Sequence, residues 1–130
     1  MNIVVGYDGS KSAKVALKVA KMHGKAFNAK VYVLFSLMGG HDEKLADIEK
    51  AEQDLKYAKD YFDDAGIECE VQQLVKGLPP GEDLVEYAKQ NNADEIIIGI
   101  RKKSKVGKLV FGSTAQYVIL EANCPVVSAK

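Results

Sequence analysis

Apolar residues along this chain follow two kinds of pattern, and the first kind predicts β-strands. Residues 2–7 and 94–100 are short runs that are apolar almost throughout, which is typical of parallel strands covered on both faces of a sheet. Residues 67–74 alternate between apolar and polar positions, which indicates a half-exposed strand at a sheet edge. Two further runs, residues 29–37 and 125–128, complete a set of five predicted strands.

The second pattern repeats every three to four residues and predicts helices. It occupies the four segments that separate the strands: residues 12–25, 45–62, 82–91 and 112–121. Gly66 is expected to end the second helix. In the last helix, Ala115, Val118 and Ile119 form the apolar stripe that should face the core. Strand and helix therefore alternate along the whole chain.

This alternation predicts one domain over residues 1–130, a three-layer α/β/α arrangement around a five-stranded parallel sheet. The strands that are apolar throughout belong at the centre and the alternating strand at an edge, so the expected strand order is 3-2-1-4-5. Ligands of such sheets bind at the carboxyl ends of the strands beside the point where the order reverses, here between strands 1 and 4. The residues expected there are Gly6, Tyr7, Asp8, Gly99, Ile100 and Arg101.

The overall charge is balanced, with 18 Lys and Arg against 18 Asp and Glu. A neutral chain gives no indication of a nucleic-acid or membrane surface, so we expect neither as a partner. Any site for a polyanion must therefore depend on a local cluster of positive charge. No apolar stretch approaches the roughly twenty residues that span a bilayer, and no signal sequence precedes the first strand. These features predict a cytoplasmic protein.

The cysteines and histidines show none of the spacings that hold a metal ion. Cys69 and Cys124 lie far apart without a Cys-x-x-Cys pattern, so both are expected to be reduced thiols. Cys69 alternates with polar neighbours and should be a small core residue. His23 and His41 are isolated in the sequence, and we expect both to be exposed.

The segment from residue 96 to residue 116 has the order strand, cationic loop, helix start, and this order predicts an anion site. A helix start exposes backbone N–H groups without intrahelical partners and carries a partial positive charge. Gly112 lets a ligand approach the backbone closely, and the hydroxyls of Ser113 and Thr114 can donate to a phosphate. Ser113 could equally serve only as the N-cap of the helix, so both interpretations stay open.

Two more features carry alternative interpretations. Asp8 before Gly9 can close an Asx turn or contact a ligand at the switch point, and Tyr7 beside it is expected to pack. The cations of residues 101–108 can be a solvated surface or can contact phosphates just before a helix. A Walker A loop is excluded because the Gly-Lys pair of this segment is followed by leucine.

Several motifs together resemble those of the universal stress protein family, and the resemblance covers essentially the whole chain. They are Ile-Val-Val-Gly-Tyr-Asp-Gly-Ser at residues 3–10, Gly77-Leu78-Pro79, residues 93–99, Gly112-Ser113 and Cys124-Pro125-Val126. ATP-binding members of that family carry Gly, two residues, Gly, nine residues, Gly and then Ser or Thr. Gly99, Gly112 and Ser113 match the first, third and last of these places, and Lys102 occupies the second.

The resemblance implies a fold like that of the adenine-nucleotide α-hydrolases and a regulatory protein that binds ATP or another adenine nucleotide, with or without Mg²⁺. It places Asp8 against the ribose or adenine, the backbone of Ser36 at the adenine edge, and Gly99 with residues 112–114 around the phosphates. With the strand ends and the loop cations, the expected binding residues are Gly6, Tyr7, Asp8, Ser36, Gly99, Arg101, Lys102, Gly112, Ser113 and Thr114. The final strand is an uncovered sheet edge, and both this and the resemblance indicate a homodimer paired there.

The sequence shows no nucleophile–base pair and no acidic pair beside the expected phosphates, so we expect at most slow ATP hydrolysis. Two other functions stay open. In the first, Lys102 closes the site and the protein is a nucleotide-independent interaction partner. In the second, Asp8-Gly9-Ser10-Lys11-Ser12 weakly resembles the phosphate loop of ATP pyrophosphatases, although only the serine ends match.

Overall fold

The computed structural model describes residues 1–36, 45–74, 78–100 and 112–130. Its elements are β1 (Asn2–Gly6), α1 (Lys11–Phe27), β2 (Lys30–Ser36), α2 (Leu45–Asp64), β3 (Cys69–Leu74), α3 (Pro80–Gln90), β4 (Glu95–Gly99), α4 (Ser113–Glu121) and β5 (Val126–Ala129). The strands form one parallel sheet in the order β3-β2-β1-β4-β5. The predicted fold class and strand order are confirmed, because a helix returns the chain to the same end between successive strands.

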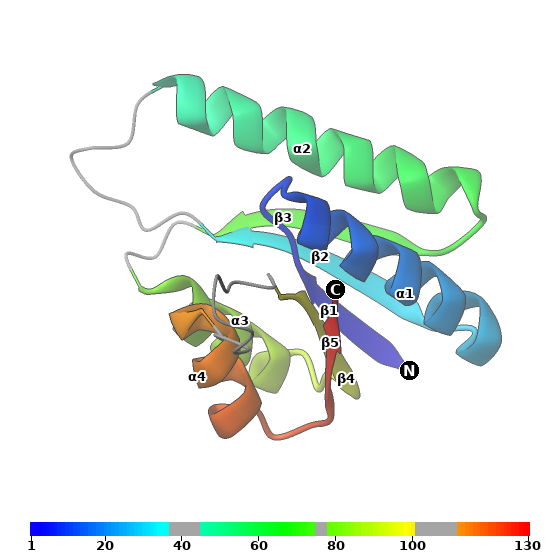
Figure 1. Cartoon of the computed structure of the whole chain (residues 1–130). Helices are drawn as coiled ribbons and strands as arrows, with labels where there is room; N and C mark the ends of the chain where they lie inside the picture. The colour runs from blue at the N-terminus through cyan, green and yellow to red at the C-terminus, as the bar shows by residue number, and fades with distance from the viewer. Residues whose placement is uncertain (37–44, 75–77, 101–111) are drawn as a thin grey trace.

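The sheet lies between two layers of helices, with α1 and α2 on one face and α3 and α4 on the other (Figure 1). In the central strand β1, Ile3 and Val5 pack in the core under α1 and α2, whereas Val4 packs in the core under α3 and α4. All three side chains are fully buried. A strand covered on both faces needs apolar residues at every position, which explains the continuous apolar run of β1.

β3 forms one edge of the sheet, as its alternating pattern predicted. Cys69 is buried, whereas Glu70 and Gln72 are exposed. Burial is the main cause that raises the pKa of the Cys69 thiol to about 12, so the prediction of an inert core cysteine is confirmed. Lys59 of α2 donates a hydrogen bond to the backbone carbonyl of Cys69 at 2.7 Å. This edge therefore carries charged groups, which discourage pairing with another strand.

The predicted apolar stripe of α4 is wrong at one position. Ala115 and Val118 are buried, but Ile119 is 42% exposed. α4 packs mainly against α3, so only a narrow side of this helix meets the core. Ile119 lies one residue beyond Val118 and therefore points about 100° away from that side.

The prediction that His23 is exposed is also wrong. His23 in α1 is half-buried, and its Nδ1 lies 2.5 Å from Oε1 of the buried Glu95 at the start of β4. The two residues are 72 positions apart, so no local pattern signals their contact. His41 lies outside the described residues. Of the helices that the structure describes, none is both long and apolar enough to cross a membrane.

Candidate functional site

The carboxyl ends of β1 and β4 lie next to each other at the switch point of the sheet. The two strands pair in parallel and end at Gly6 and Gly99. The chain leaves β1 for α1 on one face, but it passes from β4 to α4 on the other face (Figure 1). In open α/β sheets, ligands bind at strand ends where the crossovers leave in opposite directions. The structure therefore brings the carboxyl ends of β1 and β4 together, as the topology predicted.

The turn after β1 is held by its own side chains. Asp8 Oδ1 accepts a hydrogen bond from the Ser10 N–H at 2.9 Å, and Gly9 has a φ of 78°, a conformation that favours glycine. Ser10 is the N-cap of α1, because its Oγ accepts from the Ala13 N–H at 3.2 Å. The Asx-turn interpretation of Asp8 is thus confirmed. Its exposed side chain lies at the carboxyl end of β1, where a ligand contact remains a prediction.

α2 brings a second carboxylate to this turn. A Cβ at Gly9 would lie 2.5 Å from Oδ2 of Asp54, which is also 3.0 Å from Nζ of Lys50. Sequence reasoning missed Asp54, because the helical pattern of α2 does not tell which loop the helix touches. The only signal was the Asp-Gly pair, which indicates a turn that can accept close neighbours.

Tyr7 packs in the core under α1 and α2, as expected. Burial, followed by smaller effects of Asp54, Tyr57 and Asp8, raises the pKa of its hydroxyl to about 12. This hydroxyl has no hydrogen-bond partner among the described groups. The Tyr7 backbone N–H donates to the Leu34 carbonyl at 2.9 Å. Tyr7 therefore contributes to the strand end through its backbone, while its side chain points into the core.

Gly99 has a packing role of its own. A Cβ at this position would lie 2.7 Å from the Ala13 nitrogen and would overlap the backbone carbonyl of Ser12. The end of β4 approaches the first turn of α1 so closely that only glycine fits there. Gly6 is less restricted, since its Cβ would meet a flexible methyl group of Leu84 at 2.9 Å. The first glycine of the phosphate-binding pattern is thus explained by packing without a ligand.

The start of α4 is open. Gly112 is the N-cap residue and makes no side-chain cap, and Ser113 is the first helical residue. The interpretation of Ser113 as N-cap is therefore wrong by one position. The first intrahelical bond runs from the Gln116 N–H to the Gly112 carbonyl at 3.0 Å, which leaves the preceding N–H groups without helical partners. A Cβ at Gly112 would have no atom of the described residues within 4 Å, so these residues leave room for a ligand to reach the N–H groups.

Other helix starts differ from that of α4. α1 is capped by Ser10, whereas α3 carries Glu82 and the buried Asp83 in its first turn, and α2 carries Asp47. Acidic side chains at a helix start compete with a bound anion for the partial positive charge. Among the helix starts that the structure describes, only that of α4 combines an uncapped end with a first turn free of acids.

α3 holds the start of α4 beside the end of β1. A Cβ at Gly81 of α3 would lie 3.1 Å from the Tyr117 Cβ and 3.2 Å from the Thr114 carbonyl, so the two helices touch through backbone. Leu84 of α3 approaches Gly6 and belongs to the same core cluster as Ala115 in the first turn of α4. The open helix start and the switch point therefore share the same neighbours.

Three predicted site residues are described incompletely or not at all. Arg101 and Lys102 lie outside the described residues. Ser36 is the last residue of β2, paired in register with Leu74 of β3, but its side chain lies outside the description. Its backbone ends the strand next to β1, at the same edge of the sheet as Asp8.

The described side chains supply no activated thiol. Cys69 and Cys124 are both free, and burial raises the pKa of both thiols. A thiol with a raised pKa stays protonated at neutral pH and is a poor nucleophile. No group of three His, Cys, Asp or Glu side chains within the described ranges is placed to hold a metal ion.

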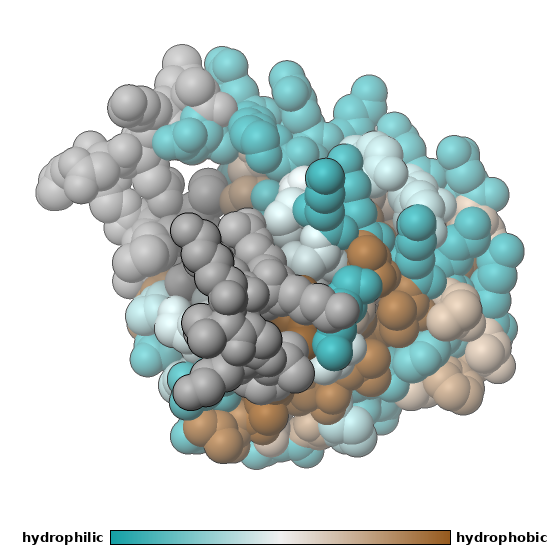
Figure 2. All heavy atoms as spheres, viewed as in Figure 1, coloured by the Kyte–Doolittle hydropathy of each residue, from teal (hydrophilic) through white to brown (hydrophobic). Residues whose placement is uncertain are grey.

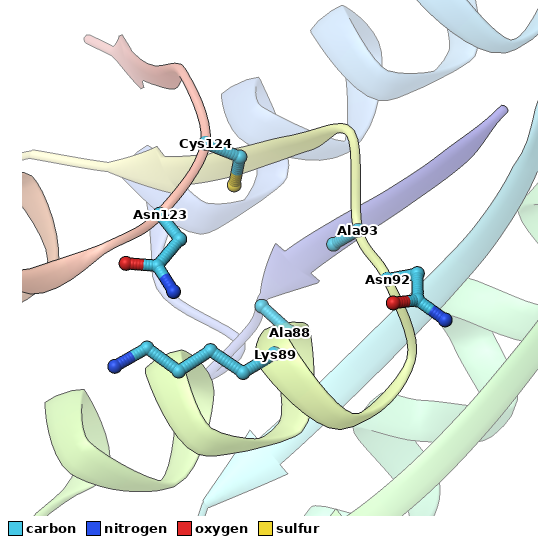
Figure 3. A pocket seen from close by; sticks show the side chains of 6 residues that line it. All are labelled: Ala88, Lys89, Asn92, Ala93, Asn123 and Cys124. Atoms are coloured by element: carbon cyan, nitrogen blue, oxygen red, sulfur yellow. The ribbon is translucent and has the colours of Figure 1, made fainter.

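A cavity of about 300 Å³ lies where the chain passes from α3 to β4 and from α4 to β5, at the end of the sheet opposite to the switch point. Figure 3 shows the side chains that line it. It is lined by Ala88, Lys89, Asn92, Ala93, Asn123 and Cys124. These residues belong to the last turn of α3 and to the connections that follow α3 and α4, where the helix dipole is negative. None of the predicted binding residues lines this cavity, and the helix ends beside it disfavour a phosphate.

Comparison with known proteins agrees with this geometry. The sequence model of the Universal stress protein family matches residues 1–130. A universal stress protein of Methanocaldococcus jannaschii is 30% identical, over 98% of this chain and 81% of that protein. A solved universal stress protein of Archaeoglobus fulgidus is 42% identical with a TM-score of 0.92, over 100% of this chain and 98% of that chain.

A second Archaeoglobus fulgidus structure, a universal stress protein in complex with dAMP, is 38% identical with a TM-score of 0.86 over 100% of this chain and 98% of that chain. The strand order, the glycine-serine helix start and the similarity along the full chain all lead to one assignment. This chain belongs to the universal stress protein family.

Proposed function

We propose that this chain is a regulatory adenine-nucleotide-binding protein of the stress response, acting as one cytoplasmic domain over residues 1–130. The observation that carries the proposal is the open start of α4 at Gly112, which offers unpaired N–H groups and partial positive charge near the switch point. The related protein in complex with dAMP supports an adenine nucleotide as the ligand.

In this proposal the nucleoside lies across the ends of the central strands. The Asp8 turn contacts the ribose or adenine, and the backbone of Ser36 contacts the adenine edge. Gly6 and Tyr7 form the strand end between them through their backbone. The Asx turn supports this role because it holds Asp8 in place before a ligand arrives.

The phosphates lie at the start of α4. Gly99 and residues 112–114 surround them, and Arg101 and Lys102 contribute positive charge from the loop. A charged contact to a phosphate is worth roughly 1.5–3 kcal/mol, so Lys102 can compensate for the glycine that it replaces in the family pattern.

Isothermal titration of the purified protein with ATP, ADP, AMP, dAMP and cyclic AMP tests the proposal. We expect saturable binding of at least one of these with one nucleotide per chain, with and without Mg²⁺. Absence of binding to all five would favour the nucleotide-independent interaction protein instead. Release of pyrophosphate from ATP would favour the pyrophosphatase-like alternative.

Lys102→Gly separates a phosphate-binding lysine from a lysine that closes the site. If Lys102 contacts phosphates, the variant should bind ATP more weakly, with a difference that shrinks as salt rises. Strong binding by the variant, with none by the natural chain at any salt concentration, would show that Lys102 occludes the site. Both proteins should be titrated at the same two salt concentrations.

We also propose that the chain forms a homodimer through β5. This edge strand exposes parts of Val126 and Val127, and the exposed apolar residues include Met22 of α1 at 63% and Leu120 of α4 at 71%. Figure 2 shows apolar side chains gathered over β5 and the neighbouring parts of α1 and α4. A two-fold axis lets each β5 donate to and accept from its copy. The charged edge at β3 is a poorer candidate.

A further inference from the structure

The lysines of α1 form a row along one side of the helix. Lys11, Lys14, Lys18, Lys21 and Lys25 recur at intervals of three and four residues, and α1 contains no acidic side chain. Residues at this spacing lie on the same side of a helix, about 5 Å apart along its axis. Four of the five are exposed, and Lys21 is half-buried. We call these five residues the α1 lysine row.

No lysine of the α1 lysine row forms an ion pair within 4 Å in the described part of the chain, although the acid-rich helix α2 lies beside the row. Elsewhere Lys30, Lys50 and Lys59 each lie within 4 Å of a carboxylate. None of the five lysines in the row makes such a pair with a described residue. The balanced overall charge conceals this, because α2 carries seven of the acidic residues and α1 none.

Two tyrosines of α2 stand beside the row. Nζ of Lys14 lies 5.3 Å from the ring centroid of Tyr57, and Nζ of Lys21 lies 5.2 Å from that of Tyr61. The two rings are stacked, with centroids 6.4 Å apart and an interplanar angle of 23°. Tyr57 is 50% exposed. A chain of phosphates that follows the lysines would therefore pass an accessible aromatic ring.

We propose that the α1 lysine row and Tyr57 bind single-stranded nucleic acid. Unpaired ammonium groups along a ridge attract phosphates, and a neighbouring exposed ring offers a surface on which a base can stack. An acidic peptide would use the charges but has no bases for the ring. A membrane surface is disfavoured because the apolar side of α1, including Ala16 and Leu17, is buried against the sheet.

This surface is separate from the phosphate part of the proposed nucleotide site, although its Lys11 end adjoins the Asp8 turn. The lysine row lies on the side of α1 that borders α2, because Lys14 and Lys21 contact rings of α2. The open helix start belongs to α4 on the other face of the sheet (Figure 1). The proposal replaces the expectation, drawn from net charge alone, that nucleic acid is no partner. It stands or falls independently of nucleotide binding.

Fluorescence anisotropy with a labelled 20-nucleotide oligo(dT), which carries no adenine, tests the proposal at several salt concentrations. If all five lysines neutralise phosphates, the slope of log K against log salt should approach about −3.5, since each single-strand contact contributes about −0.7. The double variant Lys14→Gln, Lys21→Gln should reduce the magnitude of the slope by about 1.4. The control Lys89→Gln, an exposed lysine of α3 on the other face, should leave it unchanged.

Tyr57→Leu tests the stacking contact. Loss of one base–ring contact should weaken oligo(dT) binding roughly 5- to 150-fold at constant salt, with the slope preserved. Gly112→Val should bind oligo(dT) as the natural chain does. Three outcomes would overturn the proposal. The first is no anisotropy change at 20 mM salt, and the second is a salt slope that the lysine double variant leaves unchanged. The third is normal oligo(dT) binding by Tyr57→Leu, together with competition by polyglutamate that is as strong as competition by unlabelled oligo(dT). Circular dichroism should confirm that each variant is folded.

Discussion

Gly112 is the residue on which the proposed phosphate contact depends most directly. Its φ of −63° suits any residue, and a Cβ there would meet no atom of the described residues within 4 Å. Gly112→Val should therefore leave the fold intact, while its branched side chain blocks the N–H groups of α4. We expect the affinity for the best-binding nucleotide to fall at least tenfold, or about 1.4 kcal/mol, in isothermal titration.

The control for this change is Gly112→Ala, whose single methyl group should give an intermediate affinity. Thermal unfolding should show both variants to be folded. Unchanged nucleotide affinity in a folded Gly112→Val protein would contradict the proposed site.

For Gly99 we predict the opposite effect, because protein atoms occupy the space where a Cβ would lie. A methyl group at Gly99 would overlap the Ser12 carbonyl, so α1 or β4 must shift. Gly99→Ala should lower the free energy of unfolding by about 1–3 kcal/mol, as overpacking does in other cores. Urea denaturation measures the free energy of unfolding. The control Gly112→Ala should change this free energy by less than about 0.5 kcal/mol. If the Gly99→Ala variant is as stable as the natural chain, the close approach of β4 to α1 does not require glycine at this position.

At the scale of single elements, β3 couples stability to alkaline pH through Cys69. Folding raises the pKa of this thiol from 9.0 to about 12, so the folded protein keeps a proton that the unfolded chain loses above pH 9. Stability should be fully present below about pH 9 and should fall as pH rises from there towards 12. Tyr7, whose pKa is raised from 10.0 to about 12, adds to the decline in the upper part of this window.

Urea denaturation between pH 8 and pH 11 measures this effect. Cys69→Ala should show a shallower decline than the natural chain, because the contribution of Cys69 is lost while Cys124, Tyr7 and the other tyrosines still titrate. The absolute stability of the variant is not the test, since the smaller side chain also leaves a cavity. Identical slopes for the two proteins would contradict the assignment to Cys69.

At the scale of the whole molecule, the two edges of the sheet should behave differently. Val127→Lys places like charges near the two-fold axis at β5 and should convert the dimer to monomers in sedimentation experiments. Leu120→Lys, at an exposed position of α4, tests whether this helix takes part in the dimer, with less risk to the core. Gln72→Lys, at an exposed position of β3, is the matched control and should leave the dimer intact. A natural chain that is monomeric at micromolar concentration would rule out the proposed dimer.

Local patterns were enough to predict the architecture of this protein. The apolar runs of β1 and β4, the alternation of β3 and the spacing of the helices each depend on neighbours within a few residues, so they can be read along the chain. The order of the strands followed from which runs were apolar on both faces. The Asp8 turn was also predictable, because an Asx turn is closed within three residues.

Contacts between distant segments were decided only by the tertiary structure. The need for glycine at Gly99 arises from α1, and the burial of His23 arises from Glu95 at the start of β4. The exposure of Ile119 depends on how much of α4 the core covers. Charge followed the same division, since composition determined the neutral total. Only the structure placed Lys14 beside Tyr57 and left the α1 lysines without a carboxylate of the described residues within 4 Å. Patterns along a chain report which faces are apolar, whereas packing determines which faces meet.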